Sequence, residues 1–440
     1  MRDLARTGPR GAARRGSMDL SHLLAAEWRP ALGCTEPAAV AYAAASAATQ
    51  AAGEVRHVRL VCDPRIYKNC YAVGIPNSGH RAGILWALAI GALLEDASRK
   101  LECFRGVGAP VLQGAADLIA RGALTVEVER SKKELYVECT VERAGGVGRA
   151  VLEREHTRLI RLERDGKALP LDVEPGVDET AAARGWAASL SFAHAIDAAR
   201  AAKPADRAAL RRGVEYNLAI ADHGLSLLPE GFLRPLETDG LTRIGRLVSA
   251  GVYARMSGED MLVMSLAGSG NKGITASVPV VLWGRHLGAP QEHIEEALAL
   301  ACIVTSGVTH HLGSLSAMCG SAIAGGIGVA AALVLLEGGG PDEASAATTN
   351  IVGNLAGMIC DGAKIGCALK TMTGVDAAFR AASLARAGLV IPVSDGIVGA
   401  DGAASLGNLG RLAAEGMAAM EDEILAIMQA KLARLRPPPD

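Results

Sequence analysis

Three cysteines lie in glycine-rich segments of the C-terminal half, where thiolates could hold a metal. Cys319 stands in SLSAMCGSAIAGG, and Cys360 and Cys367 stand in GMICDGAKIGCALK. On a straight helix, seven residues would separate the last two Cα atoms by about 10.5 Å, too far for one compact centre. Gly362 and Gly366 instead predict a loop that enters a helix near Cys367. Such a loop can turn both thiolates towards one centre, where the positive end of the helix would stabilise them.

Three thiolates are typical of one kind of cofactor. A [4Fe–4S] cluster held by three cysteines leaves one iron without a protein ligand, and that iron can bind a substrate as a Lewis acid. Structural zinc usually takes CxxC pairs, which this sequence lacks. Spacing alone also allows the three thiols to be free and buried. Five further cysteines stand mostly in apolar or strand-like segments and are expected to be small buried hydrophobic residues: Cys62, Cys70, Cys103, Cys139 and Cys302.

The remaining cysteine, Cys34, stands in ALGCTEPAAVAYA, directly ahead of a predicted helix. Thr35 or Glu36 would cap this helix, and Pro37 would lie in its first turn. A thiol at a helix N-terminus has a lowered pKa, so Cys34 could serve as a nucleophile or a base. The same position is equally compatible with a cysteine that has no chemical role.

Two polar loops offer contacts for a substrate. Residues 267–280, AGSGNKGITASVPV, match neither the P-loop nor the GxGxxG pattern. Their backbone amides could still form a nest for a carboxylate, although a tight turn would explain the glycines as well. Residues 73–83, VGIPNSGHRAG, form a similar loop after a strand. The predicted substrate contacts are Ser269, Gly270, Asn271 and Asn77.

Lys272 in the first of these loops could form a Schiff base with pyridoxal phosphate. The chain lacks a clear alternation of strands and helices, and no phosphate-cradling loop lies beside this lysine. Pyridoxal phosphate is therefore not expected.

The elements around these residues are predicted to be mainly helical. Of the 440 residues, 50% are hydrophobic and only 3% aromatic, and 52 are glycine, which suits closely packed helices. Residues 123–172 alternate apolar and charged side chains, as an antiparallel meander with one solvated face would. We expect an α+β protein, mainly α, with a helical catalytic domain and a small antiparallel β insertion. The predicted parts are a disordered tail 1–18, an N-terminal α/β part 19–122 that carries Cys34, the β insertion 123–172, and a helical cluster-binding domain 173–440.

Charge and hydropathy exclude several classes of protein. The net charge is −2, from 45 basic and 47 acidic side chains, which argues against a nucleic-acid binder. Residues 297–336 carry no charged side chain, but they are rich in glycine and alanine and are the one such stretch, so a buried helix is favoured over a membrane span. Arg14 and Arg15 lack the apolar run of a secretion signal, so we expect a cytoplasmic protein without disulfides. The expected partners are a small amino-acid substrate and, as a possibility, further copies of the chain.

Four motifs together carry a family resemblance. PALGCTEP at 30–37, GSGNKGITA at 268–276, SLSAMC at 314–319 and GMICDGAKIGCALK at 357–370 resemble the L-cysteine desulfidase family. That family is related to the iron–sulfur L-serine dehydratases, whose α-subunit-like region the chain also resembles. The match runs in order from about residue 20 to the C-terminus.

The resemblance implies a [4Fe–4S] enzyme that works without pyridoxal phosphate. It assigns the cluster to Cys319, Cys360 and Cys367, and the proton-abstracting base to Cys34. The implied reaction is β-elimination of L-cysteine to pyruvate, ammonia and sulfide. L-Serine dehydration is the alternative within the same class, and a non-catalytic iron–sulfur sensor or binding protein is the alternative from another class.

The chain departs from the family pattern at two places. Lys272 stands where the family usually has glutamine, and Gly313 and Ser314 stand where a basic residue often precedes the third motif. Neither change touches the proposed cluster cysteines. Both bear on which amino acid is the substrate.

Overall fold

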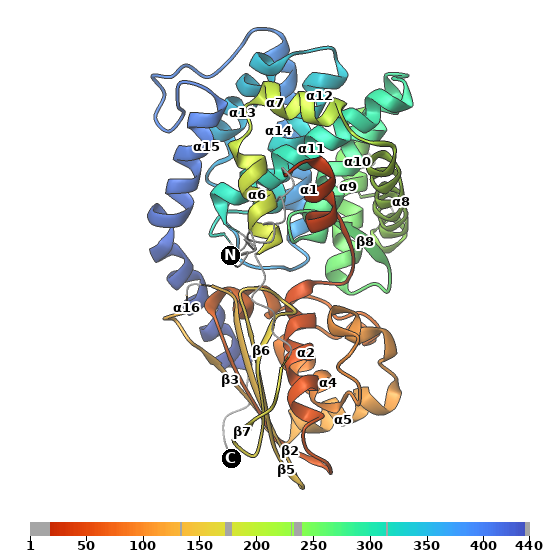
Figure 1. Cartoon of the computed structure of the whole chain (residues 1–440), viewed down its shortest axis with the longest axis vertical. Helices are drawn as coiled ribbons and strands as arrows, with labels where there is room; N and C mark the ends of the chain where they lie inside the picture. The colour runs from red at the N-terminus through yellow and green to blue at the C-terminus, as the bar shows by residue number, and fades with distance from the viewer. Residues whose placement is uncertain are drawn as a thin grey trace, which may run out of the picture.

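The computed structural model consists of a helical part and a smaller part in which helices cover a β-sheet (Figure 1). The prediction of an α+β protein that is mainly α is confirmed. The expected tail 1–18 lies outside the described residues except for its last residue, as does the boundary expected at 172–173. The structure describes residues 18–132, 134–171, 178–229, 231–232, 240–313 and 316–435.

A six-stranded sheet with the order β3-β2-β4-β5-β6-β7 forms the smaller part. Strand β2 (Val55–Cys62) lies between β3 (Leu124–Val128), to which it is parallel, and β4 (Tyr136–Arg143), to which it is antiparallel. Helices α2 (Thr35–Ala48) and α4 (Ile84–Leu93) pack against this sheet and share its hydrophobic core. The other elements of this part are β5 (Gly146–Glu153), β6 (Leu159–Arg164), β7 (Lys167–Ala168), α3 (Pro64–Cys70), η1 (Lys100–Gly106) and α5 (Ala109–Ala120).

The strands after residue 123 do not form a sheet of their own, because β2 from the N-terminal segment is one of its inner strands. The helices between β2 and β3 return the chain to the end of the sheet at which β2 begins. Such a crossover makes the two strands parallel. The expected antiparallel meander therefore holds for the neighbours β2-β4-β5-β6-β7, whereas β3 pairs with β2 in parallel. The segments from α2 to α5 and from β3 to β7 therefore share one sheet and one core.

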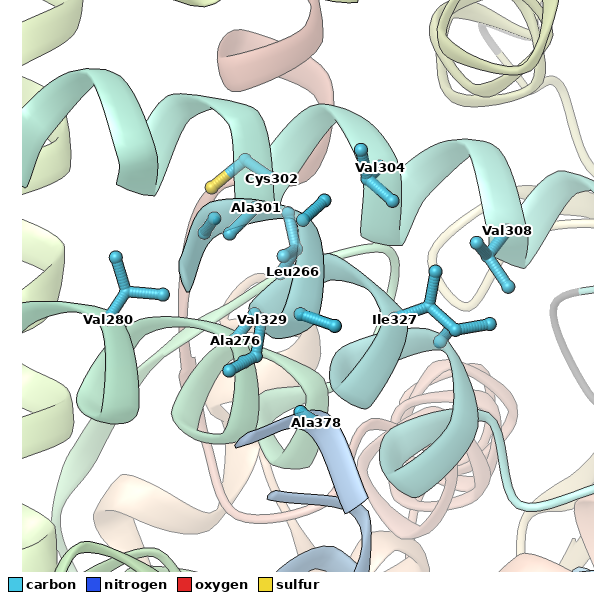
Figure 2. Packing of buried hydrophobic residues seen from close by; sticks show 14 of the residues in the cluster. Leu266, Ala276, Val280, Ala301, Cys302, Val304, Val308, Ile327, Val329 and Ala378 are labelled. Atoms are coloured by element: carbon cyan, nitrogen blue, oxygen red, sulfur yellow. The ribbon is translucent and has the colours of Figure 1, made fainter. Parts of the chain in front are cut away.

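Helix α12 (Gly320–Leu336) forms the centre of the helical part and is buried along nearly its whole length. Figure 2 shows side chains of α10 (Gly270–His286) and α11 (Gln291–Leu312) packed around it. The uncharged stretch 297–336 thus forms buried helices, as predicted. Among the described residues, every helix is too short or too polar to cross a bilayer. The other helices of this part are α1 (Leu20–Glu27), α6 (Glu179–Ser189), α7 (Phe192–Arg200), α8 (Pro204–Leu227), α9 (Gly240–Ser257), α13 (Pro341–Leu355), α14 (Cys367–Arg386) and α15 (Gly402–Arg411).

Two elements join the parts. Strand β1 (Arg29–Leu32) follows α1 and pairs in antiparallel fashion with β8 (Leu262–Ser265), so the chain enters α2 from within the helical part. After η3 (Leu412–Gly416), helix α16 (Ala418–Leu435) runs down the side of the molecule to the sheet (Figure 1). There Leu425 is buried in the core that α2 and the sheet share.

Candidate active site

A cavity of about 90 Å³ lies between the two parts, and residues from all four motifs line it. Cys34, Glu36, Lys68 and Asn69 reach it from the sheet part. The helical part supplies the glycine-rich loop and the three C-terminal cysteines. Six of the eight predicted site residues therefore line one cavity: Cys34, Ser269, Asn271, Cys319, Cys360 and Cys367.

Backbone pairing brings Cys319 and Cys360 side by side. The amide of Cys319 donates a hydrogen bond to Met358 O at 2.9 Å, and the amide of Cys360 donates one to Ala317 O at 2.7 Å. These reciprocal bonds form a short antiparallel bridge between segments that lie about forty residues apart in the sequence. The bridge holds both cysteines at the same wall of the cavity.

Two of the cysteines lie at helix N-termini. Cys319 is the N-cap of α12, and Cys367 is the first residue of α14, reached by the loop that the glycines predicted. Helices α12 and α14 pack directly against each other. The positive ends of both helices therefore face the same wall and would stabilise thiolates there.

The three thiols influence one another's protonation. Burial raises the pKa of Cys319 to about 12, and the charges of Cys360 and Cys367 raise it further. Burial also raises the pKa of Cys367. Cys319 and Cys367 therefore hold their protons when nothing is bound, and as thiolates the three cysteines would need a cation beside them, which a metal centre supplies.

Three thiols on one wall are a donor set that could hold an iron–sulfur cluster. Among the described residues, no three His, Cys, Asp or Glu side chains surround one point as the ligands of a single ion do. Thiolates that hold a cluster bind different irons and need not converge in this way. The neighbouring carboxylate of Asp361 is engaged by Lys370, which leaves the three thiols as the residues that could hold the cluster.

On another wall, Cys34 is buried as the N-cap of α2, and its thiol donates to Oε2 of Glu36 at 2.8 Å. Glu36 also accepts from Thr35 Oγ1 at 3.0 Å and from Asn69 Nδ2 at 3.1 Å. Burial raises the pKa of Cys34 well above its usual range, and the charge of Glu36 adds to this. The predicted lowering of this pKa is wrong, because burial and the adjacent carboxylate outweigh the helix N-terminus.

The glycine-rich loop turns sharply before α10. Ala267 and Gly268 have φ values of 49° and 75°, and Ser269 is the N-cap of the helix. In the first turn, the buried Lys272 donates to Ala267 O at 3.0 Å. Burial and then the charge of Arg184 lower the pKa of Lys272 to about 7, which places a titrating amine on the cavity wall.

Arg255 at the end of α9 ties this loop to the Cys34 segment. It donates from Nη1 to Asn271 Oδ1 at 2.9 Å and from Nη2 to Gly33 O at 2.8 Å. Gly270 packs against this guanidinium, since a Cβ there would lie 2.4 Å from Nε of Arg255. It does not line the cavity. Gly270 is thus needed for close packing rather than for substrate contact.

Asn77 is not brought to the cavity. It adopts a left-handed turn with φ 58°, and its Nδ2 donates to Phe104 O at 3.2 Å within the sheet part. The polar loop around it is a turn stabilised by its own side chains. Sequence reasoning also missed three buried polar residues that contact the site, and only their apolar surroundings in the sequence could have signalled them: Lys68, Asn69 and Arg255.

A larger cavity of about 600 Å³ adjoins the first, and Thr35 and Gly268 line both. His156, from the segment between β5 and β6, lines it with a buried Nε2 atom that has no hydrogen-bond partner in the described part of the chain.

Comparisons with known proteins show which family the chain is related to. A sequence model of the family described as serine dehydratase alpha chain matches residues 142–426. A UPF0597 protein of Geobacter sulfurreducens is 37% identical over 425 residues, which cover 94% of this chain and 99% of that protein. UPF0597 proteins of Desulfotalea psychrophila and Caldanaerobacter subterraneus are 35% and 33% identical, over 91% and 95% of this chain and 96% and 100% of their own lengths. The chain belongs to the serine dehydratase alpha chain family.

Proposed function

We propose that the protein is an iron–sulfur lyase that catalyses β-elimination of L-cysteine to pyruvate, ammonia and sulfide. The family is one of serine dehydratase-type lyases, which supports the reaction class. The observation that carries the proposal is the single cavity that has three cysteines on one wall and Cys34 on another. A buried free-thiol role would not require these four residues, from both parts of the molecule, to meet.

Cys319, Cys360 and Cys367 are the residues that would hold a [4Fe–4S] cluster. When bound through three thiolates, such a cluster supplies an iron without a protein ligand, which acts as a Lewis acid on the leaving group. Lys364 and Lys370 lie beside these cysteines and would offset the negative charge of the thiolates.

The chain's own residues would bind the amino acid and move its proton. The first turn of α10, with Ser269 and Asn271 on the cavity, offers backbone amides at a helix N-terminus for the α-carboxylate. Cys34, as a thiolate, would take the α-proton. The volume of about 90 Å³ suits a substrate with few heavy atoms.

L-Serine is the second candidate substrate, and the description of the matching family favours it. The motifs around Cys34 and the three cysteines favour L-cysteine through the resemblance described above. Both amino acids release the same aminoacrylate, which hydrolyses to pyruvate and ammonia, so the two candidates differ in the departing atom alone.

Anaerobic turnover separates the candidates. Protein reconstituted with iron and sulfide should release pyruvate from L-cysteine faster than from L-serine. The reverse order would make it an L-serine dehydratase, and a brown protein that produced no pyruvate from either would be a sensor or binding protein. Cys360→Ala should lose iron and pyruvate formation together, whereas stoichiometric zinc without a visible chromophore would contradict the cluster.

A further inference from the structure

We propose that Glu36 takes the proton of the Cys34 thiol and later returns it to the departing group, so that the base is a Cys34–Glu36 pair. This inference rests on the proposed function and deepens it. It assigns a proton-carrying role to a residue that the resemblance left without one.

The geometry of the pair is that of a proton donor and its acceptor. The Cys34 thiol donates to Glu36 Oε2 at 2.8 Å, both side chains are buried, and both line the cavity. Cys34 caps α2 and Glu36 lies in its first turn. The positive end of α2 therefore stabilises the negative charge whether the thiol or the carboxyl carries it.

The surroundings keep this carboxyl ionised and fixed in position. Asn69 binds Oε1, and Thr35 and Cys34 bind Oε2, so both oxygens are held. Burial alone would raise the pKa of Glu36, but the charge of a protonated His156, the hydrogen bond from Cys34 and the charge of Arg255 bring it below its usual value. Burial lowers the pKa of His156 itself, so near neutral pH the hydrogen bonds and Arg255 carry this effect. Burial and the Glu36 charge keep the pKa of Cys34 high, so the resting pair is a thiol and a carboxylate.

A buried thiol with a high pKa cannot act as a base unless its proton has somewhere to go, and Glu36 provides that acceptor. The S–H bond of Cys34 breaks as an O–H bond forms on Glu36. The substrate Cα–H bond then breaks, its proton goes to the Cys34 sulfur, and its electron pair forms the Cα–Cβ double bond as the Cβ–S or Cβ–O bond breaks. The proton on Glu36 passes to the departing hydrosulfide or hydroxide, which restores the thiol and the carboxylate.

The cycle closes without an outside proton source, because the former α-proton stays on Cys34 for the next turnover. Other charged or titratable groups face the pair from neighbouring elements and would move its titration as a whole. They are Arg255 on α9, His156 between β5 and β6, Lys272 on α10 and Cys70 on α3.

Glu36→Gln tests the proposal, because glutamine keeps the shape but cannot carry the proton. The variant should still bind iron, as judged by visible absorbance. Removal of the negative charge should lower the pKa of Cys34. Anaerobic alkylation of Cys34 by iodoacetamide at pH 7, followed by peptide mass spectrometry, should therefore be faster than in wild type, by about tenfold for each unit by which the pKa falls. Turnover of L-cysteine or L-serine should nevertheless fall by about 100-fold or more.

A substrate whose leaving group needs no proton separates a relay from a merely structural role. β-Chloro-L-alanine loses chloride, which needs no proton, so Glu36→Gln should lose at least about tenfold less activity on it than on L-cysteine. The loss that remains reflects the missing acceptor for the Cys34 proton. Glu36→Asp should recover part of the lost L-cysteine activity, and the exposed Glu54→Gln should behave as wild type.

Equal losses on all three substrates, or a Glu36→Gln variant with wild-type turnover, would overturn the relay. If wild-type protein produces no pyruvate while alkylation still responds to Glu36→Gln, the proposed function has failed and the electrostatic pairing of the two residues remains. The two failures are therefore distinguishable.

Discussion

At the scale of single residues, burial rather than helix position sets the protonation of the thiols. Cys34 begins a helix, yet the loss of water around it and the adjacent Glu36 keep its proton bound. The helix N-terminus offsets only part of that cost, because its effect is worth at most about 2 kcal/mol. A sequence shows which cysteines begin helices but not how deeply they are buried, which explains the wrong expectation for this pKa.

Cys34→Ala should keep the cluster and lose turnover. The three cluster cysteines lie on another wall, so visible absorbance and iron per chain should match the wild type, while pyruvate release falls by at least about 100-fold. Cys302→Ala is the matched control, because this cysteine lies in the core between helices (Figure 2) and should affect stability alone. Normal pyruvate release by Cys34→Ala would remove Cys34 as the base.

Lys272 should make stability depend on pH above neutrality. Its folded pKa of about 7 lies below the ordinary value of 10.5, so between these values the unfolded chain binds more protons than the folded one. The contribution of Lys272 to the free energy of unfolding should therefore rise with pH across this window, whereas the buried thiols with raised pKa values contribute the opposite slope. Lys272→Gln should remove this rise and stabilise the apoprotein at pH 7, by an amount on the order of a few kcal/mol.

Urea unfolding at pH 7 and pH 10 measures this effect. The exposed Lys167→Gln is the control and should keep the wild-type difference between the two pH values. If Lys272→Gln showed the same change of unfolding free energy between pH 7 and pH 10 as wild type, the buried amine would not titrate in this window.

At the scale of elements, glycines set the distance between α12 and α14, the two helices that begin at Cys319 and Cys367. A Cβ on Gly374 would lie 2.5 Å from Ala322 O, so alanine there must push the helices apart. Gly374→Ala should cost about 1–3 kcal/mol of unfolding free energy. It should also lower the iron bound per chain, because it separates the N-termini that carry the cysteines.

Gly407→Ala provides the matched control. Gly407 also lies within a helix, α15, but a Cβ there would meet no atom within 4 Å. Alanine should therefore stabilise by up to about 1 kcal/mol through its better helix propensity, with unchanged iron content. Wild-type stability and iron content in Gly374→Ala would show that the helices have room to adjust.

The sequence allowed the local features of the site to be predicted better than its long-range contacts. Glycines around Cys360 correctly indicated a loop that leads into a helix at Cys367, since backbone preference is local. The bridge that sets Cys319 beside Cys360 depends on two distant segments, and spacing could not reveal it. The prediction that Asn77 contacts substrate failed for a related reason. Polar residues that stabilise a turn and polar residues that bind a ligand are of the same types, so sequence does not separate them.

At the scale of the whole molecule, the site belongs to neither part alone. The sheet part supplies Cys34 and Glu36, and the helical part supplies the glycine-rich loop and the three cysteines. A division of the sequence into domains at 122 and 172 could not show this. Strand β2 pairs with strands that follow residue 122, and β1 pairs with β8, which follows residue 172. Homo-oligomer formation stays a prediction, which analytical ultracentrifugation would test.

Helix α16 should stabilise the arrangement of the two parts through a buried ion pair. Lys68 is only 2% exposed, and its Nζ lies 2.9 Å from Oε1 of Glu421 on α16. The backbone oxygen of Lys68 also packs against Gly362, in the loop between Cys360 and Cys367. Because Glu421→Gln would leave a buried cation without its counter-charge, it should lower the free energy of unfolding by about 3 kcal/mol and reduce iron loading.

The next residue on α16, Asp422, gives the control for this prediction. Arg130 and Asp422 lie 3.1 Å apart but are 51% and 64% exposed, so water screens their attraction. Asp422→Asn should therefore cost less than about 1 kcal/mol and leave iron loading unchanged, as measured by urea unfolding and iron analysis of the same samples. If Glu421→Gln behaved like Asp422→Asn in both measurements, the contact between α16 and α3 would not be what holds the cysteine loop against the sheet part.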